Sequence, residues 1–166
     1  DVNSSGIIDV KGSVNASSTS SAGGTVKLLG ETVNLWANAD VEADGTTGGG
    51  EVLIGGNYLG KGPEPNAKRT VLVPGSQVSA NATVDGDGGR VIVWSDDFTA
   101  TFADITSTGA GEGTGGFIET SSKELLQARG SVDPGVGGIW LLDPRNLTVN
   151  DVSTANVDYD GGDPNT

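Results

Sequence analysis

The chain has 166 residues, a mass of 16.6 kDa and a formal net charge of −13, with 28 glycines and no Cys, Met or His. This composition excludes a disulfide framework, a Cys/His metal site and thiol or imidazole catalysis. The acidic charge repels phosphate backbones and no apolar run is long enough to span a bilayer, so we expect no nucleic-acid partner and no membrane insertion.

Apolar residues occur in short bursts rich in Val and Ile, and each burst ends at Gly, Asn, Asp or Ser. This pattern predicts an all-β protein built of many short strands that are joined by tight turns. In chain order, the predicted strands span residues 7–10, 13–16, 25–29, 32–36, 41–44, 51–54, 70–73, 77–84, 90–94, 99–102, 104–108, 117–121, 124–128, 131–133, 139–143 and 147–149.

A Gly-Gly pair followed by a strand recurs five times, with spacings of 26, 39, 27 and 22 residues. The long spacing contains an insert of 13 residues, Asn57–Arg69, which is rich in Gly, Pro and Lys, and without it the spacing is 26. Three predicted strands per 22–27 residues are typical of a parallel β-helix, here with about five to six turns. The alternative is a β-sandwich in which the Gly pairs recur by accident.

Residues two and four places after the second glycine of each pair predict the core of this helix. Strand alternation puts both positions on one face, so equivalent side chains stack about 4.8 Å apart in a narrow, dry core. Trp140 falls at one of these positions and is too bulky for it, so we expect a distortion or a change of register at the last turn. The two predicted columns are Val26, Val52, Val91, Ile118 and Trp140, and Leu28, Ile54, Val93, Thr120 and Leu142.

Several glycine-rich segments follow one another in an order that is similar to a known family. These segments are Gly48–Gly56, Gly60–Gly62, Asn66–Ala67, Gly86–Asp96, Gly115–Ser121 and Trp140–Pro144. Over about residues 6–150, the series resembles the passenger region of large exoproteins exported by two-partner secretion, such as filamentous-haemagglutinin-like and high-molecular-weight-type adhesins. The resemblance implies a right-handed β-helix, exported by an outer-membrane transporter partner and either secreted or displayed on the outer surface of a Gram-negative bacterium.

The secretion module of that family carries an Asn-Pro-Asn-Gly-type motif, which does not occur in this sequence. We therefore expect an internal piece of a longer passenger. Residues 1–150 are predicted to form a β-helix segment with the loop 57–69 inserted, and residues 151–166 to form an irregular acidic tail.

Carboxylates are scattered along the chain. Enzymes built on β-helices need clustered carboxylates with a Lys or Arg base, and no such pair occupies matched positions, so we expect no catalysis. Two groups alternate with Gly and resemble fragments of calcium loops. Neither group completes a calcium motif, and tight turns use the same residues, so we expect no cofactor, with calcium as the alternative. The two groups are Asp85 and Asp87, and Asp158, Asp160 and Asp163.

Aromatic and basic residues supply the candidate binding positions. Trp36 and Trp94 border predicted strands, where they either stack on sugars or cover the edge of the core. Lys61, Lys68 and Arg69 bring three of the nine positive charges into the insert. The insert is either a binding loop or a flap over one face of the helix, and the flap fits better because the resemblance includes the insert.

Four Asn-x-Ser/Thr sequons occur, at Asn3, Asn15, Asn81 and Asn146. Some high-molecular-weight-type adhesins carry glycans at such sequons, so the resemblance makes these asparagines candidates for glycosylation.

Together these features predict a segment of a secreted or surface-displayed bacterial adhesin that acts as a rigid rod and an interaction surface. Its expected partners are the outer-membrane transporter during export and then a host-cell, glycan or biofilm-matrix receptor. Two alternatives remain open at this point: a carbohydrate-binding or carbohydrate-active β-helix module, and the stalk of a contact-dependent toxin-delivery protein.

Overall fold

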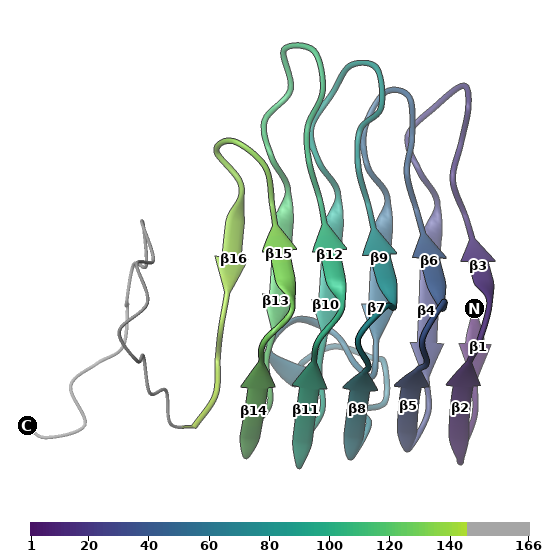
Figure 1. Cartoon of the computed structure of the whole chain (residues 1–166), viewed down its shortest axis with the longest axis vertical. Coiled ribbons are helices and arrows are strands. Elements are labelled where there is room, and N and C mark those ends of the chain that lie inside the picture. The colour runs from purple at the N-terminus through teal and green to yellow at the C-terminus, as the bar shows by residue number, and fades with distance from the viewer. Residues whose placement is uncertain (146–166) are drawn as a thin grey trace, which may run out of the picture.

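Residues 1–145, which the computed structural model describes, form a parallel β-helix of three sheets (Figure 1). The first sheet contains β1 (Val2–Asn3), β4 (Thr25–Leu29), β7 (Glu51–Ile54), β10 (Arg90–Val93), β13 (Phe117–Thr120) and β16 (Ile139–Leu141). The second contains β2 (Ile7–Val10), β5 (Thr32–Leu35), β8 (Arg69–Leu72), β11 (Phe98–Thr101) and β14 (Leu125–Ala128). The third contains β3 (Ser13–Asn15), β6 (Asp40–Glu42), β9 (Gln77–Ser79), β12 (Asp104–Thr106) and β15 (Ser131–Asp133).

Each strand pairs in parallel with the equivalent strand one turn along the chain, and each full turn contributes one strand to every sheet. We number the turns by their first-sheet strand, so that turns 1 to 5 begin with β1, β4, β7, β10 and β13. The strand β16 follows turn 5. This topology confirms the predicted all-β solenoid with three strands per turn and is incompatible with a sandwich, whose sheets are antiparallel.

The predicted core columns are confirmed for turns 2 to 5 by the register of the first sheet. Val26 pairs with Val52 and Val52 pairs with Val91, while Ile54 lies between Leu28 and Val93 in the same way. All six of these side chains are buried. The period of the Gly pairs therefore identified both the strands and the face of each strand that points inward.

The expected change of register at Trp140 is wrong. Trp140 keeps its place beside Ile118, and β16 continues the same register along the sheet. The ring is 39% exposed and its N–H donates to the hydroxyl of Thr120 at 2.9 Å. Trp140 thus keeps the register of the sheet while part of its side chain stays outside the core.

The glycine pairs lie where the main chains of neighbouring turns approach one another. A Cβ atom on Gly49 would lie 2.0 Å from the carbonyl oxygen of Ala80, and a Cβ on Gly88 would lie 2.0 Å from that of Ser107. Only glycine fits at such distances. Each glycine pair lies at the end of a long loop that joins the third sheet to the first. These loops project beyond the strand ends in Figure 1.

On the inner face of the second sheet, side chains with hydroxyl groups replace aliphatic ones in the later turns of the helix. Val33 is followed in the same inward column by Thr70 and Thr99, all of them fully buried. The Thr70 hydroxyl donates to the carbonyl oxygen of Trp94 at 2.7 Å, and the hydroxyls of Thr99 and Ser95 lie 2.7 Å apart. These hydrogen bonds offset the cost of removing the hydroxyls from water.

Candidate functional site

The insert, residues 57–69, lies across the outer face of the first sheet. It opens with a short 3-10 helix, η1 (Tyr58–Gly60). The ring of Tyr58 meets Phe117 of β13 edge to face, with 5.7 Å between the ring centroids. The guanidinium carbon of Arg90 in β10 lies 5.4 Å from the centre of the Tyr58 ring. The start of the insert is therefore fixed against two consecutive turns beyond its own.

Three outward side chains of this sheet are buried, although strand alternation alone would expose them. Leu53 of β7 and Ile92 of β10 are 1% and 0% exposed, and Trp94, which follows β10, is 5% exposed. Together with Phe117 they form a second, small apolar cluster that is separate from the core inside the helix. The first sheet therefore carries buried apolar side chains on both faces.

Glycines in and beside the insert let its main chain close onto the indole of Trp94. A Cβ atom on Gly60 would lie 2.4 Å from Cζ2 of Trp94, and a Cβ on Gly56 would lie 2.8 Å from its Cδ1. Gly60 also has a φ of +63°, which lies in the left-handed region that residues with a side chain rarely adopt. The contact between the insert and Trp94 therefore depends on these two glycines.

An ion pair joins the middle of the insert to turn 2. Nζ of Lys27 in β4 lies 2.8 Å from Oε1 of Glu64, and the Asn57 side-chain amide donates to Oε2 of Glu64 at 2.7 Å. The hydrogen bond from Lys27, followed by that from Asn57, lowers the pKa of Glu64 to about 2. Glu64 is therefore ionised at neutral pH and holds both donors.

Glu119 of β13 is fully buried beneath the insert. The main-chain N–H of Leu59 donates to its carboxylate, with 3.2 Å from the nitrogen to each oxygen. Burial raises the pKa of Glu119; the Leu59 N–H, the Ser121 hydroxyl and the charge of Arg90 oppose that rise, and the charge of Asp143 adds to it. Leu59 has a φ of +54°, which is unusual for leucine.

The three cations that sequence reasoning placed in the insert do not converge on one site. Lys61 is exposed within the insert, whereas Lys68, just before β8, forms an ion pair with Glu31. Arg69 begins β8 and stacks on Phe98, with 5.0 Å between its guanidinium carbon and the ring centre. Lys68 and Arg69 therefore belong to the edge and outer face of the second sheet.

The two candidate tryptophans have different surroundings. Trp94 lies beneath the insert, so it covers the first sheet and offers no open ring face to a sugar. Trp36, which follows β5, is 43% exposed. Its indole N–H donates to Asp9 at 2.9 Å, and Nζ of Lys11 lies 5.9 Å from the ring centre. Binding at Trp36 stays a prediction.

Asp85 and Asp87 use their carboxylates to tie two stacked loops together. Oδ1 of Asp87 accepts the N–H of Thr114 at 2.7 Å, and Oδ1 of Asp85 accepts the N–H of Glu112 at 3.2 Å. The bond from the Thr114 main chain is the main cause of a lowered pKa at Asp87. Within residues 1–145 no three acidic side chains are gathered as metal ligands. The other calcium candidates lie outside the described residues: Asp158, Asp160 and Asp163.

The sequons differ in how free their amides are. Asn3 and Asn15 are exposed, but the side-chain amide of Asn15 donates to Oε2 of Glu42 in the next turn. Asn81 is half-buried, and its amide nitrogen donates to the hydroxyl of Thr106 at 2.9 Å, so a glycan there would displace a bond between turns. Asn146 lies outside the described residues.

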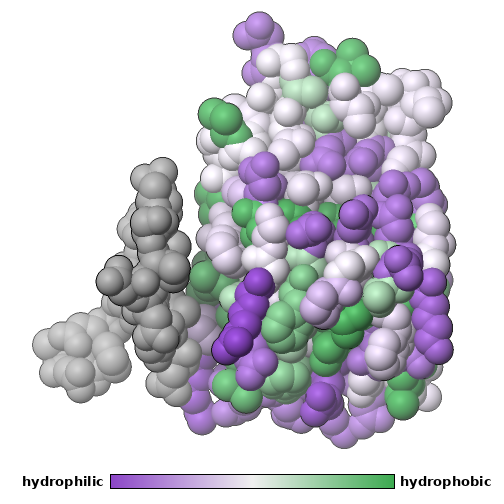
Figure 2. All heavy atoms as spheres, viewed as in Figure 1, coloured by the Kyte–Doolittle hydropathy of each residue, from purple (hydrophilic) through white to green (hydrophobic). Residues whose placement is uncertain are grey.

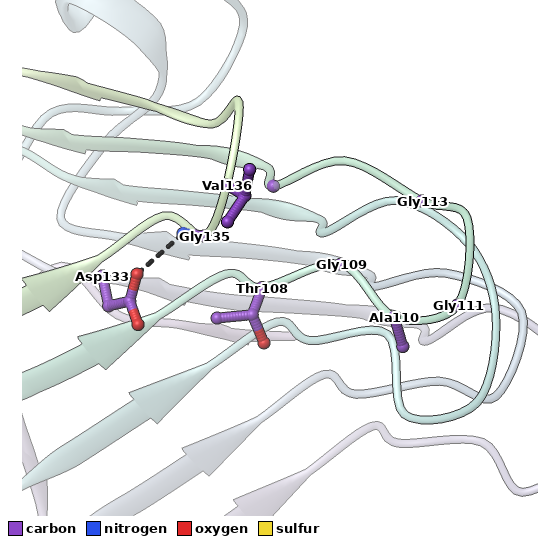
Figure 3. A pocket seen from close by; sticks show the side chains of 9 residues that line it. Thr108, Gly109, Ala110, Gly111, Gly113, Asp133, Gly135 and Val136 are labelled. Carbon is purple, nitrogen blue, oxygen red and sulfur yellow. Dashed lines mark hydrogen bonds between the residues drawn. The ribbon is translucent and has the colours of Figure 1, made fainter.

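Two hollows open away from the insert. The larger, of about 740 Å³, lies among the glycine-rich loops 108–115 and 133–136, where Asp133 turns its carboxylate to the N–H of Gly135 (Figure 3). The smaller, of about 340 Å³, lies on the outer face of the third sheet. Figure 2 views the second and third sheets and shows apolar side chains between hydrophilic ones. The acidic residues that line the smaller hollow are Asp40, Glu42, Asp44 and Asp104.

Sequence reasoning missed Glu119, Glu64 and Lys27. The available signal was the outward column of the first sheet, in which Leu53 and Ile92 stand in register with Glu119. Two large aliphatic side chains at adjacent outward positions indicate a covering segment. The insert, which begins three residues after β7, is the nearest segment able to cover them.

Comparison with solved structures finds the HMW1 secretion domain from Haemophilus influenzae, with a TM-score of 0.60 and 26% sequence identity. The likeness covers 82% of this chain and 38% of that chain, so this chain spans well under half of its length. No family model and no curated protein sequence matches the chain. The likeness supports the resemblance to high-molecular-weight-type exoproteins at the level of a shared fold and a secretion-domain neighbour.

Within residues 1–145 no helix has the length and apolar character needed to cross a membrane.

Proposed function

We propose that the chain is part of an exoprotein exported by two-partner secretion from a Gram-negative bacterium. The observation that carries the proposal is the likeness of its β-helix to the HMW1 secretion domain, at 26% identity over 82% of this chain. The partner that follows from this proposal is an outer-membrane transporter. The same neighbour is a secretion domain and not an enzyme, which supports a role without catalysis.

The exported segment would then act as a rigid rod. Its strands hydrogen-bond along the helix axis through five turns, and the two inner columns of the first sheet run without a break from turn 2 to turn 5. Such a ladder resists bending because each turn is tied to its neighbours by main-chain bonds as well as by packing. Adhesion to a host-cell, glycan or biofilm-matrix receptor is the role we propose for the outer faces.

The place of the segment within the exoprotein has two versions. The lack of an Asn-Pro-Asn-Gly-type motif in this sequence favours an internal passenger segment, whereas the solved neighbour favours the secretion module itself. In-frame deletion of residues 1–145 from the full-length protein separates them. Loss of export would assign the segment to the secretion module, and continued export of a shorter protein would assign it to the passenger.

The proposal as a whole is tested in the native host with and without the transporter. The full-length protein is expected in the medium or on the cell surface when the transporter is present, and in the periplasm when its gene is deleted. Protease added to intact cells reports surface display, and a periplasmic protein serves as the lysis control. Equal export with and without any outer-membrane transporter of this class would refute the proposal.

A further inference from the structure

The insert touches more turns than its place in the chain requires. It leaves the helix between β7 and β8, in turn 3. Its Glu64 pairs with Lys27 of turn 2 at 2.8 Å. On the opposite side, the side-chain amide of Asn66 donates to Oδ1 of Asp96 in turn 4 at 3.1 Å. Contacts to these two neighbouring turns reinforce what the stacked strands already provide.

The contacts of the insert with turn 5 are of a different kind. The N–H of Leu59 donates to Glu119, and the ring of Tyr58 packs on Phe117. In a solenoid each repeat contacts only its immediate neighbours, and stability is close to a sum of neighbour terms. A contact from turn 3 to turn 5 passes over turn 4 and adds a coupling that the strand ladder lacks.

We propose that residues 57–69 act as a latch that closes when turn 5 docks and then holds turns 3 to 5 together as one cooperative unit. Before β13 pairs with β10, the N–H of Leu59 lacks the Glu119 carboxylate as its acceptor, so no protein hydrogen bond compensates its left-handed backbone. After docking, turn 5 cannot leave without opening the insert, which exposes Ile92 and Trp94 to water. If the chain emerges with its N-terminus first, the insert becomes available to fold before Glu119 does. The latch then stays open until residue 119 has emerged and β13 can pair with β10.

The groups around Glu119 make the closed latch sensitive to pH. Burial raises the pKa of Glu119. Arg90 of β10 presents the opposing positive charge, and Asp143, after β16, presents a further negative charge. An acid whose pKa is raised in the closed state binds its proton more tightly there than in the open state. Closure is therefore favoured below the raised pKa and weakens as the pH rises through it.

Residue-resolved hydrogen exchange in the whole chain tests the latch at the Leu59 amide. In the wild type, the Leu59 amide and the amides of β13 are expected to exchange through one shared opening. Glu119→Ala removes the acceptor, so protection of Leu59 is expected to fall about tenfold or more, while β13 begins to exchange independently. Glu112→Gln, which changes an exposed loop glutamate, is the matched control and is expected to alter neither.

The variant Glu119→Gln and the quenching of tryptophan fluorescence provide two further tests of the latch. Glu119→Gln retains an acceptor without the charge, so Leu59 is expected to stay protected and to lose the pH dependence of its protection. In a Trp36→Phe, Trp140→Phe background, acrylamide quenching of Trp94 is expected to increase in Glu119→Ala.

Wild-type-like exchange of Leu59 in Glu119→Ala would overturn the proposal. In the wild type, exchange of the β13 amides through openings in which the Leu59 amide stays protected would also overturn the proposal. If Glu119→Ala does not fold, Glu119→Gln decides: an undiminished pH dependence of Leu59 protection, after correction for the intrinsic exchange rate, would overturn the proposal.

Discussion

Replacing Ile92 with alanine measures how firmly the insert covers the first sheet. Ile92 points outward from β10, yet it is 0% exposed and lies in register between Leu53 and Glu119. The substitution removes three carbon atoms, worth about 2.4 kcal/mol at ~0.8 kcal/mol per buried methylene. The cavity left behind adds to this loss, so we expect a destabilisation of about 3–4 kcal/mol, within the usual range for a buried Ile. On a bare β-helix the same position would face water.

Ile7→Ala is the matched control, because Ile7 also points outward from its strand but is 68% exposed. We expect it to change the free energy of unfolding by about 0.5 kcal/mol or less. Urea unfolding followed by far-UV circular dichroism gives both values, with the m-value checked for constancy. Equal losses for Ile92→Ala and Ile7→Ala would refute the view that the insert seals this face.

Three further substitutions test the core, the glycine contact and the ion pair. Val52→Asp places an unpaired charge in a fully buried column and is expected to cost several kcal/mol, seen as a large drop in the urea midpoint; an unchanged midpoint would contradict the inward register. Gly60→Ala puts a Cβ 2.4 Å from the Trp94 ring, so we expect a lower Tm and red-shifted tryptophan emission, and unaltered emission would count against the contact. The pKa of Glu64 is lowered from 4.5 to about 2, so the stability due to its bonds is complete above the unfolded pKa and disappears as the pH falls toward 2. Lys27→Met is expected to flatten this acid limb in a series of Tm measurements, whereas an identical acid limb would refute the pairing.

The inner architecture was predictable from the sequence because local rules repeat along a solenoid. The pairs that contain Gly49 and Gly88 recur because only glycine permits two turns to approach so closely. Strand alternation then assigns Val52 and Val91 to the inside without further information. Even the polar change in the core, from Val33 to buried threonines, keeps this alternation.

Only the tertiary structure decided which outward side chains of the first sheet are buried. Alternation predicts that Ile92 and Glu119 face water, and Trp94 was predicted to be either a sugar platform or an edge residue. Their burial depends on where 13 inserted residues fold, and Leu59 meets Glu119 across 60 positions of sequence. Local propensity and periodicity carry no information about such a contact, because its position is fixed by packing between turns that are distant in sequence. The sequence thus determined the solenoid and its core, and the fold of the insert decided which outward residues are removed from water.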